Sequence, residues 1–486
     1  MEQQEFKKKS LGLNAVLNGI RTVLNLFFPL ITFPYVSRVL KVESIGKYNF
    51  AQSVNQYFLL LAALGISTYA IREGTKIRND REKFNNFSSE IFSINLVSMM
   101  ASYVILFLCV IFIPKFQSYR IIILIFSIEL IFTTIGIEWM YSIYEEYAYI
   151  TIRSIIFKVL SIILLFVLVK KPEDYIVYAG ITVFANAGSN ILNLVHSKKY
   201  CTLKIVLKKN LLKHLKPIMI IFACTVATSI YVNSDTTMLG FMTTNYEVGI
   251  YSVSSKVYRI VKQMLASILV VSIPRLAFLM GQKKMDEYKK TLTNIFNVLV
   301  ILMFPAIVGL FLLSKEIVLL ISGPEYIQAT NSLRLLAIAL AFCIFGWIYN
   351  QCVLIPAKQE KIVMFATILS AVANIALNFV LIPLCKVNAV AISTIVAEGI
   401  SMAVCVYYGK SIVKLGKGVV KNGFTVCIGC IPIVIICILI QKLNLSIVLT
   451  LFWSIGFSAI GYGMTLVLLK NELIITYLNK RIKSNR

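Results

Sequence analysis

The sequence predicts an all-α polytopic membrane protein with about fourteen transmembrane helices. Of its 486 residues, 58% are hydrophobic and only 14% are charged, whereas a soluble domain keeps roughly a quarter of its residues charged. The apolar residues fall into blocks close to the length of about 20 residues that spans a bilayer. Lysine and arginine gather in alternate connections between these blocks, which is typical of a chain that crosses a membrane repeatedly.

The first apolar block, from Leu11 to Tyr35, follows a short polar start with three lysines. Such a start resembles that of a signal peptide, but no small-residue cleavage site follows and the apolar run is too long. We therefore interpret this block as a retained first span. The predicted spans are 11–35, 48–71, 86–113, 119–140, 150–169, 175–195, 217–241, 248–274, 290–314, 331–354, 362–384, 387–408, 422–440 and 446–469.

The basic residues orient these spans. The termini and the even-numbered connections hold most of the lysines and arginines, for example the lysine-rich connection at about 196–216. The positive-inside rule therefore places both termini in the cytoplasm. A net charge of +26 also suits a nucleic-acid partner, but its placement beside membrane spans argues against one. The connection at 196–216 divides the chain into six spans and eight.

An internal repeat supports this division. Four pairs of residues are each separated by 203 positions: Gly46 and Gly249, Tyr48 and Tyr251, Val54 and Val257, and Arg72 and Arg275. A parallel repeat is typical of transporters with two lobes around a central cavity. We predict an N-terminal lobe at 1–216 with spans one to six and the central basic loop, and a C-terminal lobe at 217–409 with spans seven to twelve. Spans thirteen and fourteen and a basic cytoplasmic tail follow at 410–486.

Two predicted spans carry polar side chains at helical spacing, which places them on one face of each helix. The first span has Asn14, Asn18, Arg21 and Asn25, and the sixth has Thr182, Asn186, Asn190 and Asn193. Because polar groups inside a bilayer are costly, these stripes predict a water-filled cavity. Hydrogen bonding between helices in a dry bundle is the alternative for the sixth span. It suits Arg21 less, since a central guanidinium needs a carboxylate, a phosphate or water.

The eighth predicted span carries Lys256, Arg259 and Lys262 at a spacing of three residues. These cations form a steep ladder along the helix, about 4.5 Å apart along its axis. Arginine binds phosphate through two parallel hydrogen bonds, and lysine binds it as a point charge. The ladder therefore predicts a phosphate-binding surface, unless this part of the span lies outside the bilayer and its cations are solvated.

Isolated acidic residues lie in three other predicted spans. They are Glu129, Asp235 and Glu398. An acid inside a membrane either neutralises a cation or binds a coupling proton or sodium ion. Pairing with Arg21 or with the ladder of the eighth span is the simpler interpretation. At the predicted cytoplasmic mouth, an aromatic stretch at 139–149 favours an interfacial belt over a surface that stacks against sugars.

Several chemistries are excluded by the residues present. The chain has two histidines, and Cys427 and Cys430 lie inside a continuous apolar run, so we expect no metal site and interpret these cysteines as packed side chains. No G-x-x-x-x-G-K-[ST] is present, and no outward connection is long enough for an exported catalytic domain. We expect no cofactor, apart from a possible coupling H+ or Na+.

Four stretches of the sequence resemble the polysaccharide-unit flippases, often called Wzx. They are FPLITFPYVSRVLKVESIGKYNFAQSVNQYF at 28–58, GISTYAIREGTKIR at 65–78, IEWMYSIYEEYAYITIRS at 137–154, and IYVNSDTTMLGFMTTNYEVGIYSVSSKVYRIV at 230–261. Two positions depart from the pattern of that family, which often has glycine at Lys41 and at Ile143.

This resemblance implies a relative of the multidrug and lipid II exporters with a MATE-like fold, and a transporter rather than an enzyme. It implies a bacterial cytoplasmic membrane, an undecaprenyl-diphosphate-linked oligosaccharide destined for O-antigen or capsule, and alternating access. A polymerase and a chain-length regulator of the same pathway are the expected partners, besides membrane lipid. In this setting the predicted diphosphate ligands are Arg21, Lys256, Arg259 and Lys262. The predicted sugar ligands are Asn14, Asn18, Asn25, Asn186 and Asn190.

Two other functions are weighed against this one. A cation-coupled drug exporter of the same superfamily usually has twelve spans, and a cationic cavity disfavours cationic drugs. A membrane polysaccharide polymerase or ligase needs an outward loop that binds the acceptor, and the predicted outward connections are short. The two additional spans and the basic ladder therefore favour the flippase.

Overall fold

The computed structural model describes residues 11–206, 211–416 and 418–476, and within them the side chains of all but residues 11–18, 20–27 and 224. Every regular element in these ranges is a helix, which confirms the predicted all-α class. By length and composition, twelve helical segments of the described chain are able to cross a membrane. The chain divides into two compact units, one that ends at Gly249 and one that begins at Ile250.

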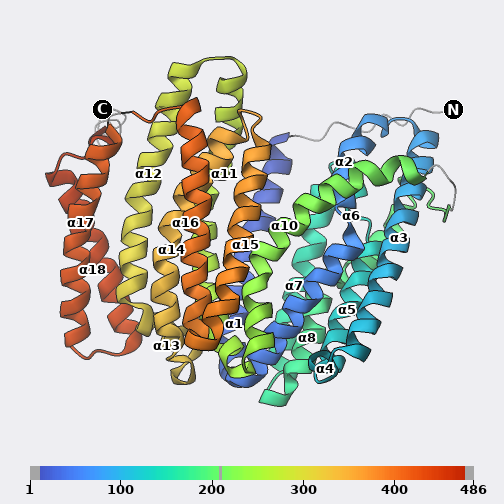
Figure 1. Cartoon of the computed structure of the whole chain (residues 1–486), viewed down its shortest axis with the longest axis horizontal. Helices are drawn as coiled ribbons and strands as arrows, with labels where there is room; N and C mark the ends of the chain where they lie inside the picture. The colour runs from blue at the N-terminus through green and yellow to red at the C-terminus, as the bar shows by residue number, and fades with distance from the viewer. Residues whose placement is uncertain (1–10, 207–210, 417, 477–486) are drawn as a thin grey trace. The chain divides into compact units, whose positions relative to one another are not determined.

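The first unit contains nearly half of the chain, and its helices are drawn in blue to green in Figure 1. They are α1 Leu11–Ala63, α2 Ile66–Ile77, α3 Arg81–Phe112, α4 Pro114–Gln117, α5 Arg120–Ile135, α6 Glu138–Ile143, α7 Tyr147–Leu168, η1 Pro172–Asp174, α8 Tyr175–Val183, η2 Phe184–Gly188, α9 Asn190–Ser197 and α10 Leu212–Met242.

Two features of this unit explain why the described chain has twelve such segments, although about fourteen spans were predicted. The predicted spans 11–35 and 48–71 fall on α1 and α2, and residues 28–77 of these helices make one such segment although α1 is kinked at Lys41. The predicted span 119–140 is replaced by α5, whose 16 residues fall short of the roughly 20 that cross a bilayer. Helix α5 ends early because Ile137 adopts a left-handed conformation with φ of 38°, which breaks the helical path before α6.

Helix α1 bends at Lys41, between the two predicted spans that it joins (Figure 1). Lys41 has φ of 62° and ψ of 172°, a combination that is essentially confined to glycine. A lysine here therefore holds the backbone under strain, at the position where the flippase family often has glycine.

Replacing Lys41 with glycine should raise the free energy of unfolding by about 1 kcal/mol. Relief of the backbone strain, about 1–3 kcal/mol, exceeds the entropic cost of a glycine, about 0.5–1 kcal/mol. Thermal unfolding of the purified protein in detergent measures the difference. Lys41→Ala is the matched control, since it removes the same side chain and keeps the strain. A glycine variant no more stable than the alanine variant would contradict the prediction.

The repeated glycines Gly46 and Gly249 form a reciprocal pair of close contacts. A methyl group on Gly46 would overlap the carbonyl oxygen of Asn245, and one on Gly249 would overlap that of Val42. Asn245 and Val42 each lie four residues before a glycine of the pair, so the two contacts are equivalent under the 203-residue repeat. The internal repeat therefore has a structural counterpart, in which helix backbones approach each other without an intervening Cβ.

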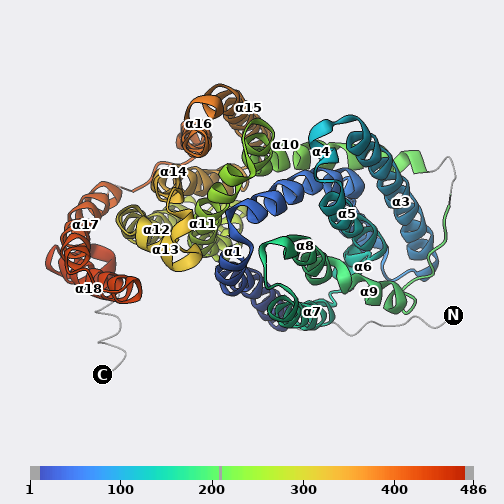
Figure 2. The same ribbon diagram turned by 90° about the horizontal axis from the view of Figure 1, so that it is seen from below.

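The predicted sixth span is interrupted. A π-helical turn, η2, separates α8 from α9 (Figure 2), and such a turn holds one residue more than an α-helical turn. The extra residue rotates the side chains of α9 about the helix axis by about 100°. Asn186 is exposed and hydrogen-bonded to Glu129, whereas Asn190 and Asn193 are buried, so the three asparagines have different surroundings.

The second unit begins within helix α11 and ends with the pair α17 and α18, which pack against each other (Figures 1 and 2). Its elements are α11 Asn245–Gly281, whose first turn belongs to the first unit, α12 Met285–Leu312, α13 Ser314–Ser322, η4 Pro324–Tyr326, α14 Ala329–Tyr349, η5 Asn350–Leu354, α15 Glu360–Cys385, α16 Val387–Ile412, α17 Gly418–Lys442 and α18 Ile447–Leu468. Cys430 lies in an apolar cluster with Ile433 and Tyr462, as expected for a packed cysteine, whereas Cys427 is exposed, so the expectation of packing was wrong for it.

Candidate functional site

A polar cavity of about 300 Å³ lies inside the first unit. Apolar residues such as Leu59 and Leu130 form one part of its wall. The polar part brings together side chains from α2, α3, α5, α6 and α9, namely Ser67, Asn95, Thr133, Thr134, Glu138 and Asn190. Hydroxyl, amide and carboxylate groups thus meet in a chamber enclosed by apolar helices, a composition that suits a polar cargo.

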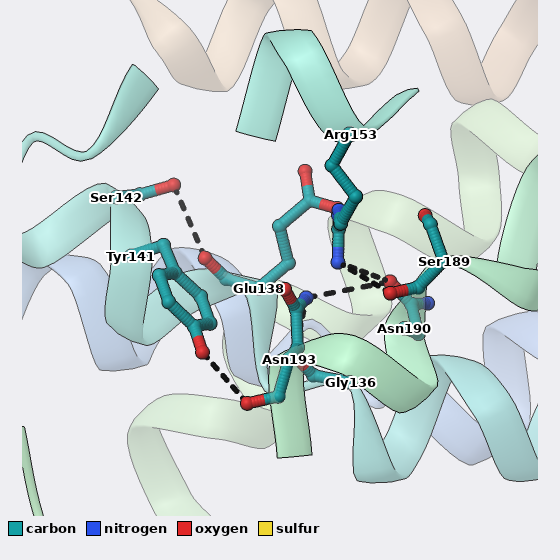
Figure 3. A network of polar contacts seen from close by, with 8 residues as sticks. All are labelled: Gly136, Glu138, Tyr141, Ser142, Arg153, Ser189, Asn190 and Asn193. Carbon is teal, nitrogen blue, oxygen red and sulfur yellow. Dashed lines mark hydrogen bonds and ion pairs between the residues drawn. The ribbon is translucent and has the colours of Figure 1, made fainter. Parts of the chain in front are cut away.

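Arg153, in α7, supplies a buried positive charge beside this cavity (Figure 3). Only 4% of its side chain is exposed. The guanidinium donates hydrogen bonds to the carbonyl oxygen of Ser189 at 3.1 Å and to Oδ1 of Asn190 at 3.3 Å. It also pairs with Oε2 of Glu138 at 3.4 Å, and this carboxylate is 38% exposed. Arg153 is therefore fixed by its partners, while Glu138 and Asn190 present polar atoms to the cavity.

Asn193 joins three elements of this network (Figure 3). Its Nδ2 donates to the carbonyl oxygen of Gly136 at 2.8 Å and to Oδ1 of Asn190 at 3.4 Å. Its own carbonyl oxygen accepts a hydrogen bond from the Tyr141 hydroxyl at 2.6 Å. A Cβ at Gly136 would collide with the Asn190 side chain, so the glycine permits this close approach. Asn193 thus forms hydrogen bonds between helices, as the alternative of a dry bundle predicts. Asn190 belongs both to this network and to the wall of the cavity.

Sequence reasoning missed Arg153 and Glu138 as site residues. The signal was present, because Arg153 is an isolated cation in the otherwise apolar first half of α7. An ionisable residue inside a membrane helix is a functional candidate by default. Glu138 was assigned to the aromatic stretch instead, since no periodicity connects it with α7.

The aromatic stretch is packed rather than exposed as a belt. Trp139, Tyr141 and Tyr144 are buried in one cluster with Tyr200 and Phe84. Burial raises the pKa of the Tyr144 hydroxyl well above its usual range, so it remains a donor, here to the carbonyl oxygen of Arg78 at 3.2 Å. The expectation of an interfacial belt was wrong for these three residues because α6 folds them against neighbouring helices.

The predicted acids of the first unit have different surroundings. Glu129, in α5, accepts a hydrogen bond from Nδ2 of Asn55 at 3.4 Å and is also hydrogen-bonded to Asn186. Asp235 is buried in α10. The described hydrogen bonds of Glu129 therefore come from amides, and the expected pairing with Arg21, whose side chain lies outside the described part of the structure, stays a prediction.

In the second unit, the ladder of α11 approaches one acid of α16. Lys262 pairs with Glu398 at 3.0 Å, and the Tyr258 hydroxyl donates to the same carboxylate oxygen at 3.4 Å. Glu398 is 9% and Lys262 30% exposed. Arg259 is exposed and Lys256 half-buried, so the three cations do not share one environment. For Glu398 the structure thus shows the expected pairing with a cation.

Four predicted site residues have side chains outside the described part of the structure. They are Asn14, Asn18, Arg21 and Asn25. Their proposed roles therefore stay predictions. The backbone of this segment is the first part of α1.

Comparison with known proteins relates the chain to membrane transporters. A family model described as polysaccharide biosynthesis protein matches residues 11–280. A protein of Shigella dysenteriae, named as a presumed O-antigen transporter, is 27% identical over 77% of this chain and 93% of its own length. The capsular polysaccharide biosynthesis protein CapF of Staphylococcus aureus is 24% identical over 76% of this chain and 92% of its own.

Solved structures share the fold. The lipid II flippase MurJ, in an inward closed conformation, matches with a TM-score of 0.76 and 14% identity over 95% of this chain and 99% of MurJ. An inward-facing MATE multidrug transporter matches with a TM-score of 0.62 and 14% identity over 82% of this chain and 97% of its own. The predicted MATE-like fold is thereby confirmed. Because the family model covers more than half of the sequence, this multi-pass membrane protein belongs to the polysaccharide biosynthesis protein family.

Proposed function

We propose that this protein is a flippase that moves an undecaprenyl-diphosphate-linked oligosaccharide repeat unit from the cytoplasmic to the outer leaflet of a bacterial cytoplasmic membrane. The observation that carries the proposal is the chamber of about 300 Å³ in the first unit, with Glu138 and Asn190 in its wall and Arg153 behind them. Hydroxyl-rich cargo needs acceptors and donors of this kind, and polar groups that face a cavity inside a membrane protein are costly without such a use.

The two units offer different chemistry to such a cargo. The chamber of the first unit is lined by hydroxyl, amide and carboxylate groups, which suit sugars. The second unit carries Lys256, Arg259 and Lys262 on α11, which suit a diphosphate. In our proposal these cations, with Arg21, hold the diphosphate. The proposed sugar ligands are Asn14, Asn18, Asn25, Asn186 and Asn190. Glu138 is a further proposed sugar ligand.

Alternating access is the proposed mechanism, in which the lobes rock about the bound head group while the lipid tail stays in the bilayer. A coupling proton or sodium ion remains part of the proposal. Glu129 is the acid best suited to bind it, because its described hydrogen bonds come from the amides of Asn55 and Asn186 rather than from a cation. Asp235 and Glu398 are weaker candidates, and Glu398 already neutralises Lys262.

Deletion of the gene should cause undecaprenyl-linked repeat units to accumulate on the cytoplasmic side of the membrane and should abolish surface polymer. A lectin or antibody against the repeat unit, applied to intact and to permeabilised spheroplasts, measures where the units lie. Accumulation of single units on the outer side would instead identify a polymerase. Unchanged polymer together with increased sensitivity to cationic drugs would identify a drug exporter. Either outcome would overturn the proposal.

A further inference from the structure

A second polar cavity, of about 370 Å³, lies in the second unit, at a place that none of the predicted cargo residues reaches. Residues of α12, of α17 and of the segment 471–476 that follows α18 line it. Helices α12 and α17 begin at the end of the unit where this cavity lies, and α18 ends at the same end. The sequence pattern predicts the cytoplasmic side for this end, since it is rich in lysine.

The wall of this cavity holds amide oxygens that lack a donor. Nδ2 of Asn471 donates to Oδ1 of Asn422 and to Oγ1 of Thr425, both at 2.8 Å. Nδ2 of Asn422 donates to the carbonyl oxygen of Asn297 at 3.3 Å. The Oδ1 atoms of Asn471 and Asn297 have no hydrogen-bond partner among the described residues, although these side chains are only 2% and 7% exposed. These two oxygen atoms are themselves buried, so they support the wall of the cavity without reaching its surface.

Two lysines give the cavity a positive balance. Lys421 pairs with Glu472 at 3.2 Å, and both side chains are exposed. Lys290, on α12, also lines the cavity and has no ion pair with any described residue. Gly418, the first residue of α17, adds the positive end of a helix dipole. The cavity therefore suits a ligand that combines an anionic group with hydroxyl groups.

Exposed apolar side chains adjoin this lysine-lined end. Val420 and Phe424, on α17, are 80% and 68% exposed, and Leu468, at the end of α18, is 80% exposed. In a membrane protein, side chains exposed to this degree contact acyl chains. A polar cavity with apolar side chains beside it matches a lipid, with its head group inside and its tails along the helices.

We propose that this cavity binds the glycerol phosphate head group of an anionic phospholipid. Lys290 and Lys421 hold the phosphate, and polar side chains of the wall such as Thr293 and Asn294 form hydrogen bonds with the glycerol hydroxyls. The acyl chains lie along Val420, Phe424 and Leu468. Basic pockets between membrane helices on the cytoplasmic side recognise anionic lipids through the same chemistry. This inference is independent of the proposed transport function.

Native mass spectrometry of the full-length protein in detergent tests the proposal, with short-chain phosphatidylglycerol and phosphatidylcholine as probes. We expect the wild-type protein to retain phosphatidylglycerol at least about fivefold better than phosphatidylcholine. Lys290→Glu should remove this preference. Lys289→Glu, a change of the neighbouring exposed lysine that does not line the cavity, is the matched control and should retain it.

Three results would overturn the proposal. Equal retention of both lipids by the wild-type protein would show that the cavity does not select an anionic head group. Equal losses in Lys289→Glu and Lys290→Glu would show attraction by surface charge without a site. Displacement of phosphatidylglycerol by millimolar glycerol 3-phosphate would assign the cavity to a soluble phosphate. Because Lys290 is exposed, its substitution leaves the fold intact, which the melting temperature of each variant verifies.

Discussion

Replacement of Arg153 with alanine should abolish surface polysaccharide and lower the free energy of unfolding by about 3 kcal/mol. The guanidinium is buried, and its loss removes hydrogen bonds to the carbonyl oxygen of Ser189 and to Oδ1 of Asn190, which keep one donor each, from Leu192 N–H and Asn193 Nδ2. A hydrogen bond made by a charged group contributes about 1.5–3 kcal/mol. The broken pair with Glu138 adds little, because that carboxylate is 38% exposed and water replaces the cation. Polysaccharide from a complemented deletion strain and thermal unfolding in detergent measure the two effects.

Three further variants separate the network from transport. Lys170→Ala removes an exposed cation just after the same helix, outside this network, and should keep both export and stability near wild type. Arg153→Lys keeps the charge but loses the planar fork, so we expect partial recovery of both. Glu138→Gln keeps a hydrogen-bonding side chain and should reduce export more than stability. Wild-type export by a correctly inserted Arg153→Ala protein would remove this network from the transport site.

Replacement of Lys262 with alanine should cost about 3–5 kcal/mol and remove most folded protein from the membrane. Glu398 would then keep a buried charge whose remaining partners are neutral groups such as the Tyr258 hydroxyl, 3.4 Å away. Breaking a buried ion pair on one side is costly for this reason, whereas replacing both partners is often close to neutral. The amount of folded protein that elutes as a single species in gel filtration measures the effect.

The double variant Lys262→Met, Glu398→Gln distinguishes packing from diphosphate binding. It removes both charges, so folded protein should return to near the wild-type amount. If Lys262 also holds the diphosphate, export should stay low in this variant. Arg259→Ala is the companion change, because Arg259 is exposed and its loss should reduce export without loss of stability. Full export by the double variant would assign Lys262 a structural role alone.

Hydropathy and basic residues were sufficient to predict the helical class and the approximate number of apolar segments, because both depend on composition within windows of about 20 residues. They did not predict where helices stop. Ile137 ends α5 through its own φ angle, and η2 inserts a residue that no apolar pattern marks. Side-chain faces deduced from a continuous 3.6-residue period were therefore correct only up to such an interruption.

The site was predictable only in part for the same reason. Glu398 was recognised as an isolated acid and Lys262 as part of a cationic ladder, and the two form a pair. Arg153 and Glu138 are 15 residues apart with a helix break between them, so their contact is a property of the fold. The network combines residues of α6, α7 and α9, so the sequence of no single one of these helices shows it as a periodic pattern.

Helix α1 is unbroken between its kink at Lys41 and Gly46, so the chain length between these two residues is fixed. Adding one residue there would turn every later side chain of the helix by about 100° and separate Gly46 from Asn245. The coil at 201–206 is held as well, because the backbone N–H groups of Thr202, Lys204 and Val206 donate hydrogen bonds to side chains of α3. Natural length variation among relatives should therefore be absent from 41–46.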